Sequence, residues 1–123
     1  MVKLEGVKFE AVYGCVPSGR VDNLAACTKL FGPKKAEAVV KATGFATRAV
    51  AAAGTTVVDL ALPAARAALA GVDPATVGGV VFVSFSAPDR FPAAAITAQH
   101  ALGLPSSVFA FDVDMACSGY PYG

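Results

Sequence analysis

Residues 108–123 read Val-Phe-Ala-Phe-Asp-Val-Asp-Met-Ala-Cys-Ser-Gly-Tyr-Pro-Tyr-Gly, and the rest of the chain is best interpreted from this segment. Its first part, 108–113, is rich in Val and Phe, which predicts a buried strand. Cys117 lies among Ala, Ser and Gly just past that strand, which predicts a sharp turn into a helix. At a helix N-terminus, unpaired N–H groups and the helix dipole favour a nucleophilic thiolate. The pattern matches a nucleophile elbow with sulfur in place of oxygen.

The local chemistry of Cys117 leaves a second interpretation open. A lone cysteine in an apolar setting is commonly a buried, unreactive small hydrophobe, and composition does not separate the two cases. Cys15 and Cys27 are most simply structural. Three cysteines without framework spacing predict neither a disulfide scaffold nor a zinc site, and we expect no metal.

The segment Asp-Met-Ala-Cys-Ser-Gly-Tyr at 114–120, after Phe-Ala-Phe-Asp-Val at 109–113, resembles the active-site segment of the ketoacyl synthase III branch of the thiolase superfamily. In that family the cysteine follows a strand of the form apolar-x-Phe-Asp-apolar and precedes a Gly and an aromatic residue. The resemblance covers nearly the whole chain. It implies that Cys117 is the nucleophile.

Composition and charge narrow the class of protein. Hydrophobic residues make up 55% of the 123 residues and charged residues only 15%, so we expect part of the apolar surface to be covered by something else. The net charge of +1, without a run of Lys and Arg, gives no case for nucleic acid. No apolar run is long enough to span a bilayer, and the N-terminus does not resemble a signal peptide, which favours the cytoplasm.

The N-terminal residues 2–16 alternate apolar and polar side chains, which predicts a strand with one solvated face. Pro17 and the two residues after it break the pattern. Asn23 is predicted to cap the helix that follows it. In the family the first strand also runs into a Pro-containing turn and then an Asn, and this chain has both.

Residues 34–41 have a helix-like composition that ends near Thr43-Gly44-Phe45. The Thr-Gly-apolar unit followed by Arg48 is another family feature. Members that load an acyl-CoA primer usually carry a Trp and an Arg shortly before Thr-Gly, and these sandwich the adenine. This chain has no Trp, and Ala38 and Ala42 stand at the corresponding places, so adenine loses its usual contacts. The donor's carrier, CoA or acyl carrier protein, stays open.

The middle of the chain has the pattern of a long helix followed by a strand. Residues 55–70 are alanine-rich and apolar, which predicts a helix buried on several sides that stops at Gly71. Pro63 should kink this helix or end its first turn. Residues 79–86 are β-branched and aromatic, which predicts a central buried strand. This strand and the one at 108–113 are separated by a helix with short links. Strand, helix and strand in this order predict a right-handed parallel crossover.

A loop ending in Phe91-Pro92 precedes an alanine-rich helix over 93–103, as in the family. In the family this Phe commonly crosses the dimer interface and forms the floor of the partner's acyl pocket, and Phe91 matches it. The alternative is a staple residue that packs on its own helix. His100 is the chain's only His and a candidate base for Cys117. Its position near the end of the helix favours another role, a positive charge that interacts with the C-terminal end of the helix dipole. In the family this position is not catalytic.

The family's catalytic His and Asn lie in a second, similar half, and no residue of this chain takes their places. We therefore interpret residues 1–123 as an α/β, thiolase-like N-terminal half-domain. The whole would be a duplicated α-β-α-β-α architecture with a mixed, mainly parallel sheet, completed by a longer polypeptide or a companion chain. The resemblance also implies a homodimer, or a heterodimer with a thiolase-like partner, because Phe109 and Phe111 lie on the strand that pairs across the two-fold axis in these enzymes.

By resemblance, the function is acyl transfer followed by carbon–carbon bond formation in fatty acid or polyketide biosynthesis. Cys117 attacks an acyl-CoA or acyl-carrier-protein thioester, and a malonyl-type extender then attacks the acyl-enzyme; no cofactor is expected beyond these thioester substrates. Phe91 and the flexible Met115 line the acyl pocket, while Ser118 and Gly119 provide room.

Two alternatives from other classes remain. One is an acyltransferase of the same fold that joins the acyl group to oxygen, nitrogen or another carbon acid in specialised metabolism. The other is a non-catalytic partner subunit. A scaffold has no need of a thiolate in a small-residue setting, so Cys117 argues against the second alternative.

Overall fold

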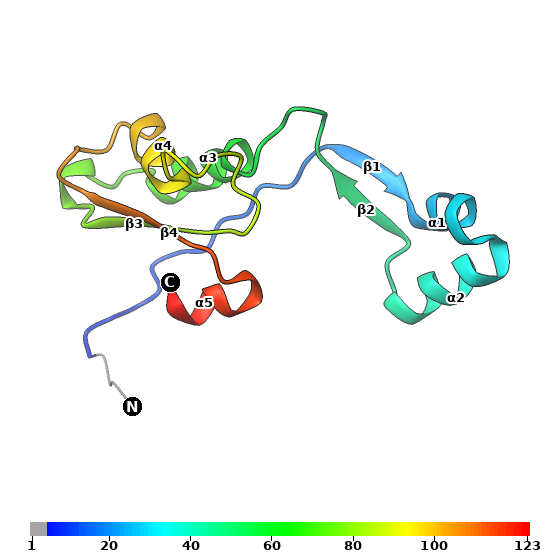
Figure 1. Cartoon of the computed structure of the whole chain (residues 1–123). Helices are drawn as coiled ribbons and strands as arrows, with labels where there is room; N and C mark the ends of the chain where they lie inside the picture. The colour runs from blue at the N-terminus through cyan, green and yellow to red at the C-terminus, as the bar shows by residue number, and fades with distance from the viewer. Residues whose placement is uncertain (1–4) are drawn as a thin grey trace. The chain divides into compact units, whose positions relative to one another are not determined.

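The computed structural model describes residues 5–123, and these form two compact units. Val16–Thr55 makes one unit (Figure 1, pale blue to green), and residues 5–15 together with Thr56–Gly123 make the other. Each unit combines helices with a two-stranded sheet, in agreement with the expected α/β class.

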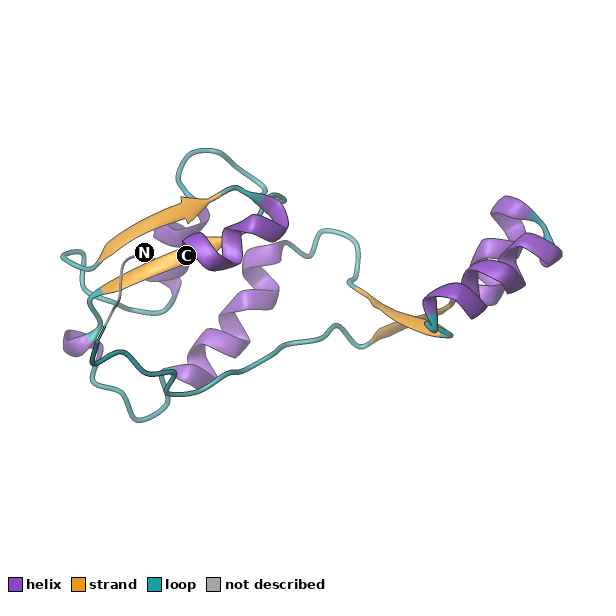
Figure 2. Ribbon diagram, turned by 90° about the horizontal axis from the view of Figure 1, so that it is seen from below, coloured by secondary structure: helices purple, strands orange, loops and turns teal. Residues whose placement is uncertain are grey.

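The larger unit is built on a parallel strand pair. β3 (Gly79–Val83) pairs with β4 (Phe109–Val113), in a register that runs from Gly79 opposite Phe109 to Val83 opposite Val113 (Figure 2). The parallel pairing predicted for these two strands is confirmed, although β3 ends before the predicted residue 86. Two helices, α3 (Val57–Ala68) and α4 (Ala94–Ala101), pack together, and α4 contacts both strands.

Small residues form the centre of this unit. The buried apolar side chains lie mostly on α4 and on the segment between α4 and β4; they are Val58, Ala94, Ala95, Ala98, Leu104 and Val108. Alanines let the helix approach the sheet closely, so the alanine-rich sequence of α4 is explained by the contact that it makes with the strands.

α3 begins with a capping box. The Thr56 side chain accepts a hydrogen bond from the Asp59 N–H at 3.1 Å, and the Asp59 carboxylate accepts from the Thr56 N–H at 2.8 Å. The bond from the Thr56 N–H to the Asp59 carboxylate, with a further one from the Thr56 hydroxyl, holds the pKa of Asp59 below its ordinary value. Pro63 lies inside α3, beyond the first turn of a helix that begins at Val57 and continues to Ala68, so the expectation that it could end the first turn is wrong, and the expected kink stays a prediction. The packing of α3 on α4 stabilises the helix despite the missing donor.

The strand predicted over residues 2–16 is not found in the part of it that the structure describes, 5–16; residues 2–4 lie outside the described residues. Alternating apolar and polar side chains give a strand one apolar and one polar face. A strand also needs a neighbouring strand that pairs with its backbone N–H and C=O groups. The side chains of Val7, Phe9 and Val12 are mostly exposed. The first strand, β1 (Gly19–Asp22), instead begins within the predicted break and pairs antiparallel with β2 (Thr47–Val50).

The smaller unit is a helical hairpin on the β1–β2 ribbon. α1 (Asn23–Phe31) and α2 (Pro33–Thr43) pack against each other, and Ala36 of α2 is completely buried. α2 ends at Gly44, which adopts a φ of 73° that favours glycine, so the helix end predicted at Thr43-Gly44 is confirmed.

Asn23 is not the cap of α1, contrary to the prediction. Asp22 takes this role, and its carboxylate accepts a hydrogen bond from the Ala25 N–H at 2.7 Å. Asn23 is the first residue of the helix, and its amide donates to the Phe45 carbonyl at 2.9 Å and accepts from the Arg48 guanidinium. Asn23 thus ties α1 to the segment that enters β2. Sequence alone could not choose between two adjacent residues that are equally good caps.

Candidate active site

Cys117 lies in a short 3₁₀ turn, Ala116–Ser118, which joins β4 to α5 (Gly119–Tyr122). The residue before the thiol, Ala116, has a φ of 44°, in the left-handed region that costs a non-glycine residue roughly 1–2 kcal/mol. The turn is closed by a hydrogen bond from the Ser118 N–H to the Met115 carbonyl at 3.0 Å. The sharp turn from strand to helix predicted from the small residues is confirmed.

The Cys117 thiol is free and exposed. The alternative of a buried small hydrophobe is therefore wrong. Within residues 5–123 the Cys117 N–H has no hydrogen-bond acceptor, so it is able to donate to an oxygen atom placed beside the sulfur. A nucleophile and an adjacent free N–H are the parts that acyl transfer needs at this position.

Gly119, directly after the turn, is buried and packs against β3. A Cβ at Gly119 would clash with Val83 Cγ1 and would lie 3.7 Å from Val113 Cγ1. The room at Gly119 is therefore used by the protein's own side chains, which seat α5 on the strand pair.

Gly119→Ala is expected to destabilise the protein by about 2 kcal/mol, because overpacking at Val83 outweighs the better helix propensity of alanine. Urea unfolding followed by circular dichroism measures this change. Val83→Ala in the same chain should restore most of the loss, because it removes the atom that clashes. No rescue by Val83→Ala would contradict the contact.

Asp112 was not singled out from the sequence, yet it joins β4 to α4. Its two carboxylate oxygens accept hydrogen bonds from the Ala94 and Ala95 N–H groups, both at 2.8 Å. Ala93, at the N-cap position, has no side chain that could do this. The signal in the sequence is an acidic residue inside an otherwise apolar strand, opposite a helix that starts with alanines.

The hydrogen bonds from the start of α4 to Asp112 form a cap on this helix, and this cap places two predicted site residues at the same end of the sheet. Phe91 comes three residues before Ala94, and Cys117 follows Asp112 by five residues. Because Asp112 binds the start of α4, the loop that carries Phe91 and the turn that carries the thiol both lie at the carboxyl end of β4.

Asp112→Ala should lower the free energy of unfolding by about 1–2 kcal/mol, because two N–H groups of α4 lose their acceptor. Thermal and urea denaturation check this. Asp114→Ala is the matched control, since Asp114 is an exposed carboxylate two residues away on the same segment. Equal stabilities of the two variants would contradict the cap.

Phe91 and Met115 are both accessible. The Phe91 side chain is 91% exposed, so the alternative that it packs on its own helix is wrong. Met115 is 45% exposed and lies two residues before the thiol. Both side chains are free to contact another molecule.

His100 lies in the last turn of α4 with an exposed side chain. This is the end of α4 opposite to the one that Asp112 caps. The structure therefore separates the only His of the chain from the end of the sheet where Cys117 lies, in agreement with its interpretation as a C-terminal charge.

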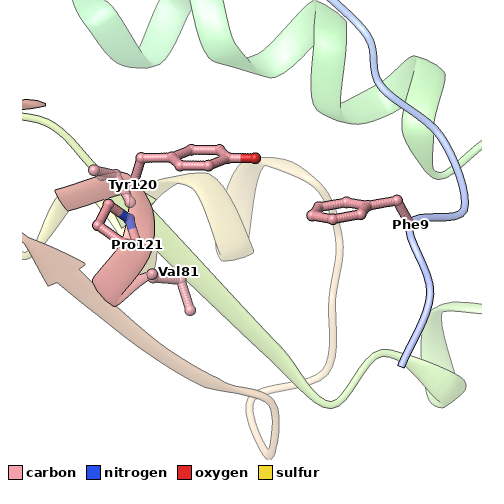
Figure 3. A pocket seen from close by; sticks show the side chains of 6 residues that line it. Phe9, Val81, Tyr120 and Pro121 are labelled. Carbon is pink, nitrogen blue, oxygen red and sulfur yellow. The ribbon is translucent and has the colours of Figure 1, made fainter. Parts of the chain in front are cut away.

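An apolar pocket of about 520 Å³ lies beside α5, and its lining residues are Phe9, Val81, Val83, Tyr120, Pro121 and Gly123. Figure 3 shows the rings of Phe9 and Tyr120 on opposite sides of it. Cys117 does not line this pocket. The pocket is therefore distinct from the space in front of the thiol.

Among residues 5–123, no group of three His, Cys, Asp or Glu side chains could hold a metal ion. Nor does any helix in this part of the chain have the length and hydropathy that a membrane span requires.

Known proteins resemble this chain in both sequence and structure. No family model matches the sequence. Over 88 residues, 70% of its length, the chain is 41% identical to a beta-ketoacyl-[acyl-carrier-protein] synthase III of Rhizorhabdus wittichii and covers 27% of that protein. The solved 3-oxoacyl-(acyl-carrier protein) synthase of Burkholderia xenovorans LB400 matches with a TM-score of 0.81 and 36% identity, over 90% of this chain and 33% of that one. A tetronic acid condensing enzyme, AbyA1, matches with a TM-score of 0.71 and 31% identity, over 89% of this chain and 35% of that one.

The thiolase-like α/β fold expected from the sequence is confirmed by these structures. The chain spans about a quarter of the length of the curated relatives that it matches.

Proposed function

This chain is a homologue of part of the beta-ketoacyl-[acyl-carrier-protein] synthase III family, and from this we propose that it supplies the nucleophile of a thiolase-like condensing acyltransferase. The observation that carries the proposal is the exposed Cys117 thiol in a turn at the carboxyl end of β4, beside a free backbone N–H.

In the first proposed step, the Cys117 sulfur attacks the carbonyl carbon of an acyl thioester. The carbonyl oxygen becomes an oxyanion, which the Cys117 N–H stabilises together with a donor from outside this chain. The carbon–sulfur bond of the donor then breaks, and its thiol leaves with the proton that the Cys117 thiol has given up. The acyl group is now bound to Cys117.

In the second step, a malonyl-type extender loses carbon dioxide, and its carbanion attacks the acyl carbonyl. The bond to Cys117 breaks, and the thiolate returns as the 3-oxoacyl product forms. The residues that orient the extender are proposed to be the His and Asn of the second half, on the same or a companion polypeptide. Phe91 and Met115 are proposed to line the acyl pocket, and their accessibility supports this role.

We further propose that the active assembly is a dimer. Phe109 and Phe111 stack on β4 with ring centroids 6.0 Å apart, and their side chains are 60% and 46% exposed. Two exposed aromatic rings on one strand support a role in an apolar contact with another chain.

A second candidate is condensation with a different carbon acid. The name of AbyA1, a tetronic acid condensing enzyme, supports this alternative. Both candidates share the acyl-enzyme, so the acceptor alone distinguishes them. A non-catalytic subunit would instead leave the thiol without an acyl group.

Intact-protein mass spectrometry tests the proposal. The complete preparation, with any companion polypeptide, is incubated with a panel of acyl thioesters of different chain length. The proposal expects one acyl mass on the polypeptide that contains Cys117, which malonyl thioester then removes. If no donor gives an adduct although the second half is present, the non-catalytic alternative replaces the proposal.

A further inference from the structure

The turn between α1 and α2 exposes two large apolar side chains. Residues 29–35 read Lys-Leu-Phe-Gly-Pro-Lys-Lys, and Gly32 is the single residue between the two helices. Leu30 is 74% exposed and Phe31 is 53% exposed. Figure 1 shows the two helices joined at the end of the hairpin that lies away from the β1–β2 ribbon. We call residues 29–35 the hairpin tip.

Three lysines flank this apolar pair, and all three keep their charge. Lys29, Lys34 and Lys35 are exposed, and over residues 5–123 none of them forms an ion pair. The nearest acid along the chain, Glu37, lies two residues beyond the hairpin tip. The Lys35 ammonium lies 5.3 Å from the centre of the Phe31 ring, which places charge and ring side by side without neutralising the charge. The hairpin tip thus combines apolar surface with unpaired positive charge.

The stability of α2 does not explain its first two lysines. Lys34 and Lys35 lie in the first turn of this helix, which has no acidic residue there and no side-chain cap. Because the helix dipole makes the N-terminal end positive, two lysines at this place destabilise α2. Lys29, in the last turn of α1, is favourably placed by the same argument. Negative charge from outside the chain, held beside the first turn of α2, would offset the unfavourable pair.

The two properties of the hairpin tip together select a lipid surface as its partner. A membrane interface accepts apolar side chains at the boundary between headgroups and acyl chains, where Leu30 and Phe31 would leave water. Lysine side chains can lay their methylene stems along this apolar layer and keep their ammonium groups among hydrated lipid phosphates.

Other partners fit only one of the two properties. A protein surface that covered Leu30 and Phe31 would also desolvate the lysines around them, which costs free energy unless each ammonium group meets a carboxylate. The backbone of a nucleic acid would attract the lysines but offers Leu30 no apolar layer. An anionic bilayer provides both the apolar layer and the negative charge.

We propose that the hairpin tip binds anionic lipid at a membrane surface, with Leu30 and Phe31 below the headgroups and the three lysines at the phosphates. Such a contact is reversible, because two apolar side chains and three lysines are a small anchor. This inference goes beyond the proposed function, since lipid binding requires neither Cys117 nor an acyl donor.

Vesicle flotation of the complete preparation, with any companion polypeptide, tests this inference. The vesicles are either pure phosphatidylcholine or an equimolar mixture of phosphatidylcholine and phosphatidylglycerol. Phe31→Ser removes apolar surface from the hairpin tip, and Lys34→Gln removes charge. Circular dichroism of each variant checks that the helices are retained.

The matched controls lie at the opposite end of the hairpin. Phe45, which is 68% exposed, follows α2, and its carbonyl accepts a hydrogen bond from Asn23 at the start of α1. Lys41 is exposed in the last turn of α2. Phe45→Ser and Lys41→Gln therefore remove the same kinds of side chain from the same unit without changing the hairpin tip.

We expect the unsubstituted protein to bind the anionic vesicles about tenfold more tightly than the neutral ones, and less tightly as salt is added. Phe31→Ser should weaken binding to anionic vesicles about tenfold, and Lys34→Gln about fivefold. Phe45→Ser and Lys41→Gln should each change it by no more than about twofold, because they lie beyond the contact.

A fluorescent reporter measures insertion directly. The chain has no Trp, so Phe31→Trp adds an indole whose emission is read as the difference from the unsubstituted protein. With anionic vesicles this emission should shift to the blue and be quenched by brominated lipid, whereas the emission of Phe45→Trp should do neither.

Three results would overturn the inference. They are no flotation of the unsubstituted protein with anionic vesicles, equal losses for Phe31→Ser and Phe45→Ser, and an unchanged Phe31→Trp emission on bound vesicles. Binding to an oligouridine without binding to vesicles would assign the hairpin tip to nucleic acid instead.

Discussion

Replacing Cys117 with alanine should abolish the acyl-enzyme, lowering the rate of acylation by a factor of about 10³ or more. The sulfur is the only atom in this proposal that forms a bond to the acyl carbon, and neither the Ala side chain nor the neighbouring Ser118 can substitute for it at the same place in the turn. Mass spectrometry before and after incubation with acyl thioester measures the loss directly.

Two observations separate this loss from a folding defect. Cys117 is exposed, so Cys117→Ala should change the free energy of unfolding by no more than about 0.5 kcal/mol. Cys27→Ala is the matched control, because it also removes a free thiol but lies in the other unit and should keep full acylation. An acyl mass that persists on Cys117→Ala would show that another residue is the nucleophile.

The largest effect on stability is expected at Gln99, which is 8% exposed. Its amide nitrogen donates two hydrogen bonds, to the Pro105 carbonyl at 2.8 Å and to the Val108 carbonyl at 2.7 Å. Gln99→Glu replaces this donor with a carboxylate oxygen of nearly the same size. We expect a loss of about 3 kcal/mol or more, because a buried charge then faces two carbonyl oxygens. Urea unfolding at pH 7 measures it.

The pH dependence of this variant identifies the cause. The two carbonyls raise the pKa of the introduced carboxyl in the folded state above its value in the unfolded chain, near 4.3. The loss should therefore shrink as the pH falls through the folded-state pKa, since the protonated acid can donate one hydrogen bond again. Gln99→Met, which removes the donor without adding charge, should cost less and show no such dependence. Equal losses for both variants at every pH would contradict this explanation.

Patterns that depend on neighbours in sequence allowed correct predictions. The apolar runs before and after α4 gave β3 and β4, and the small residues around Cys117 gave the turn that exposes the thiol. The helix end at Gly44 was likewise predicted from adjacent residues, the Thr-Gly pair at 43–44. In each case the physical cause lies within a few residues of its effect.

Features that depend on distant partners were missed or wrong. Residues 5–16 have a strand pattern, but the structure gives this segment no pairing strand. Asp112 and Gln99 are ordinary in composition, and only the folded chain shows that they bind backbone groups of other segments. Pro63 is tolerated within α3 because the packing of the helix outweighs a local penalty.

The cap on α4 has a consequence for synthesis of the chain. The acceptor for the first N–H groups of this helix is Asp112, seventeen and eighteen residues further along the chain. While a ribosome is still making the residues between them, the helix has no acceptor there and its first turn frays. The hydrogen bonds that cap α4 can therefore form only after residue 112 has left the ribosome.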